Sequence, residues 1–150
     1  MITDLKTDRF EQTRQHVHPG CVVCSKGNGQ GLKLNFRLSD DGAVSADFNL
    51  DSDFEGYPAM LHGGIICAIL DGAMTNCLFA CNCVAVTADF QVRFRHPVAT
   101  YQPACVRAWV IRYSSCLYEL HAEILQDEQV KTTATGKFMK QSHLNRDPKA

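Results

Sequence analysis

The chain has 150 residues, which fits one domain, and 45% of them are hydrophobic, enough for a core. Its formal net charge is −1 and its basic residues are dispersed, which argues against a nucleic-acid binder. The start, Met1 to Arg9, lacks the apolar centre of a secretory signal, and the longest apolar run, Ile65 to Leu70, is too short to span a bilayer. We therefore expect one cytoplasmic domain over residues 1–150, without a membrane or nucleic-acid partner.

The first part of the chain predicts a polar segment followed by a β-hairpin. Residues 1–20 are polar with little periodicity, so we expect a surface helix or arm. Leu32 to Leu38 alternates apolar and polar residues, as a half-buried strand does. Asp40-Asp41-Gly42 predicts a turn, and residues 43–50 predict the returning strand. At the other end, residues 141–150 form a polar tail that we expect to fray.

A long helix is predicted next, after a loop over residues 51–61. From Gly63 to Cys81 the sequence is apolar on nearly every side, which is typical of a helix buried on all faces. Its only charged residue is Asp71. Gly63 and Gly64 stand at its start, where the lack of a side chain allows a ligand to approach the helix N-terminus closely.

The remainder of the chain predicts four strands. Each has alternating apolar and polar residues, and the four segments are Thr87–Arg95, Ala104–Arg112, Leu117–Leu125 and Val130–Phe138. Their short connections predict an antiparallel meander, and the apolar face of the sheet must be covered. The sequence therefore predicts an α+β domain in which a curved antiparallel sheet of about six strands wraps a long buried helix.

Asp71 is the first candidate for chemistry. A carboxylate in a buried helix costs on the order of several kcal/mol to desolvate unless it is paired or functional. No basic residue lies within one helical turn of it. The alternative is a structural carboxylate that bonds a backbone amide or a distant arginine.

His62-Gly63-Gly64 is the second candidate. The first N–H groups of a helix have no internal acceptor and, with the helix dipole, attract negative charge. Thioester hydrolysis develops negative charge on the carbonyl oxygen and needs a general base or a carboxylate nucleophile. Asp71 can serve in either role. For His62, the alternative is a residue that only bonds the backbone where the helix begins.

The chain resembles a known family at these residues. His62-Gly63-Gly64, with Asp71 nine residues after the histidine, resembles the hot-dog acyl-CoA thioesterases of the phenylacetate-pathway (PaaI-like) group. The similarity extends from Cys21 to Met139, through Cys21-Val22-Val23-Cys24, Gly31-Leu32-Lys33-Leu34-Asn35-Phe36, Gly56-Tyr57-Pro58, Val86-Thr87-Ala88-Asp89-Phe90 and Pro97.

The resemblance implies a hot-dog fold, hydrolysis of an acyl-CoA thioester to an acid and coenzyme A, and roles for individual residues. Gly63 would donate the oxyanion N–H, His62 would order the helix start, Asp71 would be the base or nucleophile, and Thr87 would place a hydroxyl near the attacking water. Gly64 would lie beside the substrate.

One position departs from the family pattern. Many relatives have Asn or Gln six residues before the histidine, where this chain has Gly56. We expect Gly56 to lie against the substrate without supplying that amide.

Arginines on the predicted strands are candidates for binding the phosphates of coenzyme A. Arg93, Arg95 and Arg107 fall on predicted solvent faces, and guanidinium groups suit phosphate. We assign the first two to substrate binding. The alternative is ordinary solvated strand charge.

The eight cysteines are expected to be thiols in a reducing compartment. His16, His18, Cys21 and Cys24 have ligand types at plausible zinc spacing, and Cys81-Asn82-Cys83 is able in principle to complete such a site. We interpret them instead as packed thiols and predict no metal and no cofactor.

Helix geometry predicts the oligomeric state. Gly63 and Asp71 are separated by about 12 Å along the axis, at about 1.5 Å per residue. A reacting carbonyl needs both groups within about 3–3.5 Å. We therefore expect a homodimer with composite active sites, either alone or as a dimer of dimers.

Three other functions remain open from the sequence. The first is a non-catalytic acyl-CoA or acyl-thioester binding protein of the same fold. The second is a dehydratase or hydratase acting on acyl thioesters, which normally requires a pocket histidine as acid or base. The third is a zinc-dependent interaction domain.

Overall fold

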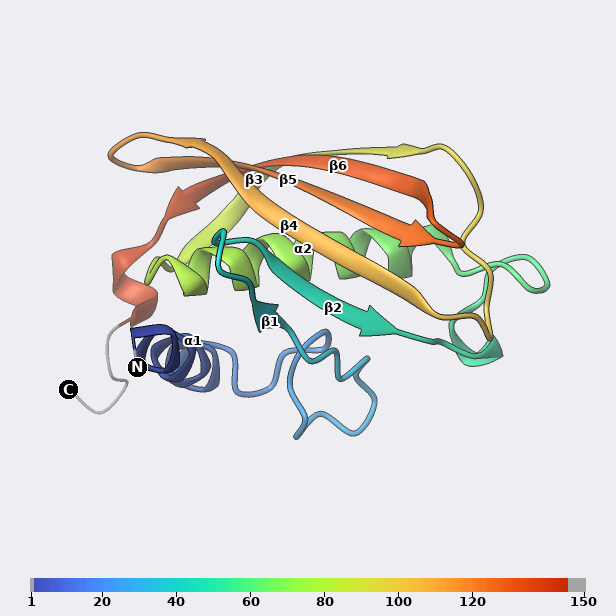
Figure 1. The fold of residues 1–150 in the computed structure, drawn as a ribbon, viewed down its shortest axis with the longest axis horizontal. Helices are drawn as coiled ribbons and strands as arrows, with labels where there is room; N and C mark the ends of the chain where they lie inside the picture. The colour runs from blue at the N-terminus through green and yellow to red at the C-terminus, as the bar shows by residue number, and fades with distance from the viewer. Residues whose placement is uncertain (1, 146–150) are drawn as a thin grey trace.

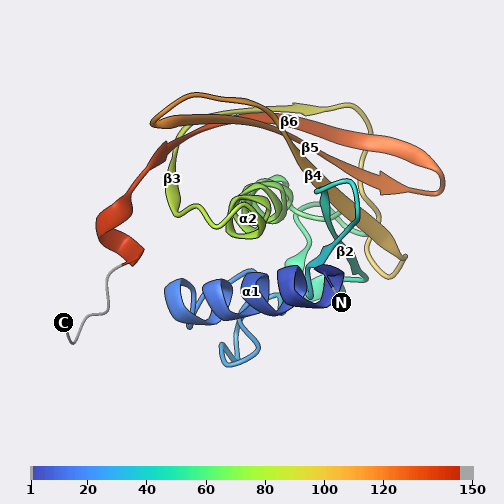
Figure 2. The same ribbon diagram turned by 60° about the vertical axis from the view of Figure 1, so that its left-hand side comes forward.

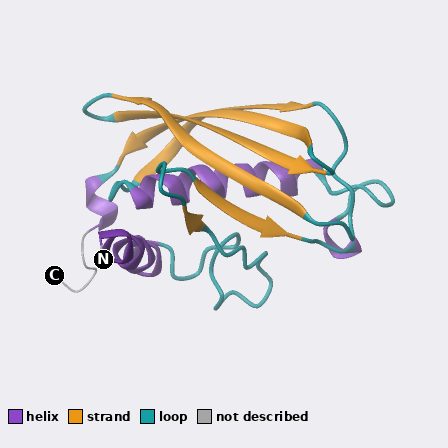
Figure 3. Cartoon of the chain, viewed as in Figure 1, coloured by secondary structure: helices purple, strands orange, loops and turns teal. Residues whose placement is uncertain are grey.

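The computed structural model of the chain describes residues 2–145 (Figure 1). Two long helices and six strands make up the described part, together with two short 3-10 segments (Figure 3). In chain order they are α1 (Ile2–Val17), β1 (Arg37–Leu38), β2 (Val44–Phe48), η1 (Ser52–Phe54), α2 (Gly63–Ala80), β3 (Ala85–Phe94), β4 (Ala104–Tyr113), β5 (Leu117–Gln126), β6 (Gln129–Lys140) and η2 (Ser142–Asn145).

The core lies between α2 and one face of a six-stranded antiparallel sheet. The sheet curves over α2, and α1 lies on the opposite side of that helix (Figures 1 and 2). Alternate residues of β4, β5 and β6 point to α2 and are fully buried, among them Val106, Leu120, Ile124 and Phe138. The predicted α+β architecture, a buried helix wrapped by a curved sheet, is therefore confirmed.

The strand order is β1-β2-β4-β5-β6-β3, which corrects the predicted meander of the last four strands. Only β4, β5 and β6 form consecutive hairpins, and β3 pairs with β6 at the far edge. The connection between β3 and β4 is too long for a tight turn. Its Val98 is buried and its Ala99 pairs with Met60, so the segment crosses the end of the core.

The predicted strand over residues 32–38 is wrong for most of its length. Only Arg37 and Leu38 pair with β2. Before them, Lys33 has a left-handed backbone (φ 53°), and the N–H groups of Leu32 and Leu34 donate to Val22 and Val23. Because Leu32 and Leu34 bond the segment of Val22 and Val23, they do not extend the sheet. The apolar side chains of Leu34 and Phe36 are nevertheless buried, which explains the alternating pattern.

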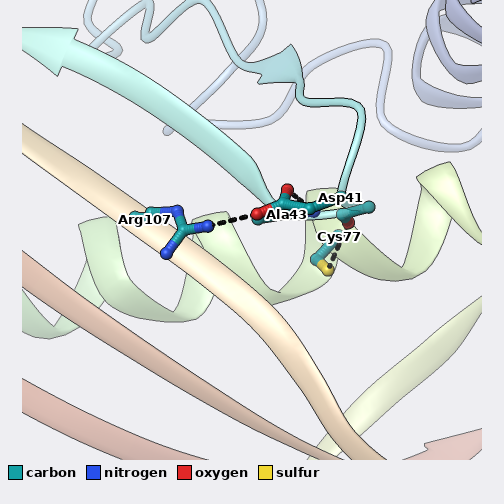
Figure 4. A network of polar contacts seen from close by, with 5 residues as sticks. Asp41, Ala43, Cys77 and Arg107 are labelled. Carbon is teal, nitrogen blue, oxygen red and sulfur yellow. Dashed lines mark hydrogen bonds and ion pairs between the residues drawn. The ribbon is translucent and has the colours of Figure 1, made fainter.

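The predicted turn between β1 and β2 is confirmed, and it is tied to both layers of the core (Figure 4). Gly42 has a φ of 84°, which favours glycine. Asp41 accepts from Arg107 of β4 at 2.5 Å and from the backbone N–H of Ala43 at 3.0 Å. The Cys77 thiol of α2 donates to the Gly42 carbonyl oxygen at 3.8 Å.

The structure agrees in part with what the sequence predicts for the two ends of the chain, a surface helix or arm and a frayed tail. The first twenty residues contain α1, whose Phe10 is buried in the core. At the other end, residues 142–145 form η2, and the rest of the predicted tail lies outside the described residues.

Within residues 2–145, α2 is the one helix long and apolar enough to cross a membrane by length and composition. It has 18 residues, and 61% of this span is buried inside the protein. The expectation that the run from Ile65 to Leu70 is too short to span a bilayer considered only the uninterrupted apolar residues, whereas the whole of α2 meets the criterion of length and composition. The sheet covers α2, so α2 is arranged as a core helix.

Candidate active site

The N-terminus of α2 is capped by His62. Its backbone is extended (φ −62°, ψ 135°), and its Nδ1 accepts a hydrogen bond from the Gly64 N–H at 2.8 Å. The His62 N–H donates to the Phe54 carbonyl oxygen at 2.9 Å. Because Nδ1 is an acceptor, the neutral ring carries its proton on Nε2. His62 therefore orders the first turn and satisfies one of its N–H groups.

Gly63 is the first residue of α2, and its N–H has no acceptor among the described residues. A methyl group at this position would lie 3.6 Å from the Phe94 ring, an ordinary contact. The peptide N–H thus remains available to an external acceptor. Its position at the positive end of the helix dipole favours an oxygen that gains negative charge.

A cavity of about 370 Å³ lies beside this N–H. Its wall comes from the loop before α2, the first turn of α2, and residues 94–98 at the end of β3 and just after it. Apolar side chains predominate, among them Met60, Ile66, Phe94 and Val98. Among the described residues that line it, none is acidic. The cavity suits an apolar group attached to a polar carbonyl, and its described lining includes two imidazoles, of His62 and His96, but no carboxylate.

Gly56 lines the cavity and packs against His62. Its N–H donates to the Met60 carbonyl oxygen at 3.0 Å, which closes the loop before α2. A methyl group on Gly56 would approach His62 Cδ2 to 3.2 Å, so a larger side chain requires the imidazole to move. The position has little room for the amide found in many relatives.

Asp71 lies two turns further along α2, half-buried, and accepts a hydrogen bond from the Thr87 hydroxyl at 2.6 Å. Burial raises the pKa of this carboxyl above its ordinary value, against the lowering effect of the Thr87 hydrogen bond and the charge of His18. A carboxylate with a raised pKa is a stronger proton acceptor. Asp71 therefore has the properties of a general base.

One chain does not bring Asp71 to the Gly63 cavity. The carboxyl is absent from the described cavity lining, and the helix rise separates the two residues by about 12 Å. Both nevertheless lie along β3, since Thr87 contacts Asp71 and Phe94 lies beside Gly63. β3 is an edge strand that pairs only with β6.

The arginines divide into two groups. Arg95 lines the cavity, and Arg93 and Arg95 together line a second hollow of about 290 Å³ on β3 and β6. Both are exposed, and neither forms an ion pair with a described residue. Arg107, in contrast, pairs with Asp41 and lies 5.2 Å over the Trp109 ring. It serves the β2–β4 packing instead.

Gly64, which the sequence analysis placed beside the substrate, is exposed and does not line the cavity.

The candidate metal ligands lie elsewhere. The segment after α1 brings His18, Cys21 and Cys24 together against α2, with ligand atoms within 4.8 Å of one another. The pKa of the Cys21 thiol is lowered, chiefly by its hydrogen bond with Cys24, whose own pKa is raised by the same bond.

Apart from Arg95, which the sequence analysis assigned to substrate binding, residues 94–98 form a part of the cavity wall that the sequence did not reveal. They lie at the end of β3 and just after it, where no local motif marks Phe94, His96 or Val98 as ligand contacts. Only the crossover after β3, which places Phe94 beside Gly63 and Val98 near Leu61, brings them there.

Comparison with known proteins identifies the class. Residues 59–133, half of the chain, match the family model of the thioesterase superfamily, and the chain belongs to this superfamily. No curated protein sequence matches it significantly.

Solved structures with the same fold are numerous. A crystal structure described as a thioesterase superfamily protein superposes with a TM-score of 0.76 at 20% identity over 79% of this chain. This chain spans 62% of the length of that protein. The Escherichia coli PaaI protein from the phenylacetic acid degradation operon gives 0.73 at 15% identity, covering 91% of this chain and 98% of that chain.

A Streptococcus mutans protein bound to acetyl CoA gives a TM-score of 0.68 at 13% identity, covering 72% of this chain and 88% of that chain. At these identities the likeness concerns the fold. It confirms the predicted hot-dog architecture, and together with the family match it confirms the predicted membership of the thioesterase superfamily.

Proposed function

We propose that the protein hydrolyses an acyl-CoA thioester to a free acid and coenzyme A. Two features of α2 together support this proposal. The free N–H of Gly63 at the start of the helix lies next to an apolar cavity, and further along the same helix Asp71 is a half-buried carboxylate with a raised pKa. The superfamily match supports a thioester as the substrate.

The Gly63 N–H donates to the thioester carbonyl oxygen and stabilises the negative charge that develops there. The acyl group occupies the apolar cavity next to Met60, Ile66 and Val98. Asp71 either removes a proton from the attacking water or attacks the carbonyl carbon itself. Thr87 holds the carboxylate in place through its hydroxyl.

The carboxylate that completes each cavity comes from a second copy of the chain. The cavity next to Gly63 has no acidic residue of its own among the described residues, and Asp71 lies beside the unpaired edge of β3. A two-fold axis along this edge gives two equivalent sites, each with Gly63 of one chain and Asp71 of the other. It also covers an exposed strand edge, which is otherwise open to aggregation.

Coenzyme A is the proposed carrier of the acyl group. Arg93 and Arg95 are exposed beside the cavity, without described carboxylate partners, and suit phosphate groups. The Streptococcus mutans protein of the same fold was solved with acetyl CoA. A cytoplasmic location, where acyl-CoA substrates are made, stays a prediction of the sequence.

The test is release of free thiol from a panel of acyl-CoA thioesters with aryl and with medium-chain acyl groups. Asp71→Asn keeps the shape of the side chain and should lower kcat by about 10²–10⁴ on the best substrate. Asp40→Asn, which changes an exposed carboxylate in the turn between β1 and β2, away from β3, is the matched control and should leave kcat unchanged.

Wild-type protein that binds the panel without releasing thiol would contradict hydrolysis and support the non-catalytic binding protein. Equal rates for wild type and Asp71→Asn would remove the carboxylate from the mechanism.

A further inference from the structure

A cluster of metal-ligand side chains lies outside the proposed active site. The chain turns sharply after α1, where the His18 N–H donates to the Arg14 carbonyl oxygen and the Ser25 N–H donates to the Cys21 carbonyl oxygen. This turn brings the imidazole of His18 and the thiols of Cys21 and Cys24 within 4.8 Å of one another. Among the described residues, no other group of three potential ligands comes this close.

The spacing of these atoms fits a tetrahedral ion. Zinc bonds of about 2.0–2.3 Å place two ligand atoms about 3.5–3.8 Å apart. The Cys24 Sγ lies 3.9 Å from the His18 Nδ1, so the pair needs to move by only a few tenths of an ångström. The two cysteines have the Cys-x-x-Cys spacing that structural zinc sites use.

The surroundings of the cysteines suit thiolates. The Val23 N–H points to the Cys21 Sγ at 3.3 Å, a backbone bond that stabilises negative charge on sulfur. The amide of Asn76 on α2 is fully buried and lies beside Cys24. Its Oδ1 has no partner among the described residues. Thiols that only fill space in a core need neither an imidazole nor polar neighbours of this kind.

A fourth coordination position has room to form. A cleft of about 280 Å³ opens beside the cluster, and both His18 and Cys24 line it. Among the described residues, no fourth side-chain ligand lies within reach of the three atoms, so a water molecule from this cleft would complete the tetrahedron.

We propose that His18, Cys21 and Cys24 bind one zinc ion. Two thiolates and an imidazole bind zinc in preference to magnesium or calcium, which prefer oxygen ligands. A reducing compartment keeps the thiols available. The ion would hold residues 18–24 in one conformation, and this segment packs on the middle of α2, where Val23 lies against Gly72 and Cys24 lies beside Asn76. This proposal is independent of thioester hydrolysis.

The experiment is metal analysis of the untagged full chain, purified without chelators and then supplied with zinc and desalted. One zinc per chain is expected. Cys21→Ser/Cys24→Ser should lose the ion, and Cys81→Ser/Cys116→Ser, which changes two exposed thiols elsewhere, should keep it. Cobalt exchanged into the wild type should give the sulfur-to-cobalt charge-transfer band and the intense visible bands of a tetrahedral site.

A chain that retains no zinc after reconstitution, with Cys21 and Cys24 either free or joined in a disulfide by mass spectrometry, would overturn the proposal. If the double variant does not fold, the cobalt spectrum of the wild type decides, together with His18→Asn, which should alter that spectrum. Unaltered cobalt bands in His18→Asn would place the metal elsewhere.

Discussion

Both halves of α2 are largely apolar, but their surroundings differ. From Gly72 to Phe79 every residue is buried, under β4 and β5 on one side and under the segment after α1 on the other. From Gly63 to Leu70 only Ile66, Ile69 and Leu70 are buried, and this half lies beside an open cavity and an unpaired strand edge. Asp71 stands where the two halves meet.

This difference shows how one apolar helix can serve as both core and site. The C-terminal half contributes packing, and its polar neighbours, such as the Asp41–Arg107 pair in Figure 4, hold the layers over it. The N-terminal half leaves apolar surface and the N–H of Gly63 uncovered. In the proposed function, substrate and a second chain provide the missing cover.

The largest expected effect of a change in the open half comes from Gly63→Pro. Proline removes the proposed oxyanion donor, and loss of one such donor typically lowers kcat by about 10²–10³. The fold should tolerate it, because proline is accepted at the first helical position and His62 already has the extended backbone (ψ 135°) that a preceding residue needs. Kinetics with the best acyl-CoA measure the effect.

Gly63→Ala is the control, since it keeps the N–H and adds a methyl in ordinary contact with Phe94. It should raise KM more than it lowers kcat. Full activity in a folded Gly63→Pro protein would exclude this N–H from the reaction.

The next largest effect tests whether two chains complete the open half. Asp71→Asn and Gly63→Pro should each be nearly inactive alone. In a heterodimer of the two, one composite site carries both changes and the other carries neither, so activity should return to about half of wild type. Differently tagged chains, co-expressed and purified through both tags, provide the sample.

A heterodimer as inactive as its parents, or an active wild-type monomer in sedimentation analysis, would refute the shared site. A homodimer of Asp71→Asn purified in the same way is the baseline.

A pair of alanine substitutions compares the packing of the two halves directly. A methyl at Gly72 would lie 2.6 Å from a methyl of Val23, whereas a methyl at Gly63 would lie 3.6 Å from its nearest neighbour, the Phe94 ring. Overpacking typically costs about 1–3 kcal/mol, so Gly72→Ala should lower the free energy of unfolding by about that amount and Gly63→Ala should change it little. Urea denaturation measures both.

Val23→Ala combined with Gly72→Ala should recover part of the loss, because the smaller side chain removes the overlap. Equal stabilities for the two single variants would mean that the closed half is less tightly packed than the structure shows.

The smallest expected effect concerns pH. Burial raises the pKa of Asp71 and the Thr87 hydroxyl lowers it, so Thr87→Val should move the acidic limb of the kcat profile to higher pH, while Thr87→Ser should leave it in place. Because the folded pKa lies above the unfolded value of about 3.9, the stability that Asp71 adds is present below that pH. It is lost as pH rises through the folded pKa.

As pH rises from about 4, the free energy of unfolding of the wild type should therefore decrease relative to that of Asp71→Asn. A difference that does not vary with pH would mean that burial does not perturb this carboxyl.

The sequence alone predicted the elements that local periodicity controls. The largely apolar stretch that follows His62 predicted α2 to within one residue, and the alternating segments predicted β3 to β6 closely. Asp71 was recognisable because it is the only charge in an apolar helix. The roles assigned to Asp71, Gly63, His62 and Thr87 stay predictions, and the structure adds a contact that the sequence did not predict, the hydrogen bond from the Thr87 hydroxyl to Asp71.

Alternation indicates which face of a segment is buried, and it does not indicate which partner the segment pairs with. For this reason the pattern over residues 32–38 predicts a strand although Leu32 and Leu34 bond Val22 and Val23. The short connections likewise predict that β3 pairs with β4, although it pairs with β6. The cavity at Gly63 was decided only by the tertiary structure, because it joins segments distant along the chain, and contacts of that kind depend on how the whole core packs rather than on any local pattern. The spacing of His18, Cys21 and Cys24 is local and visible in the sequence, and the structure decided only that their ligand atoms converge.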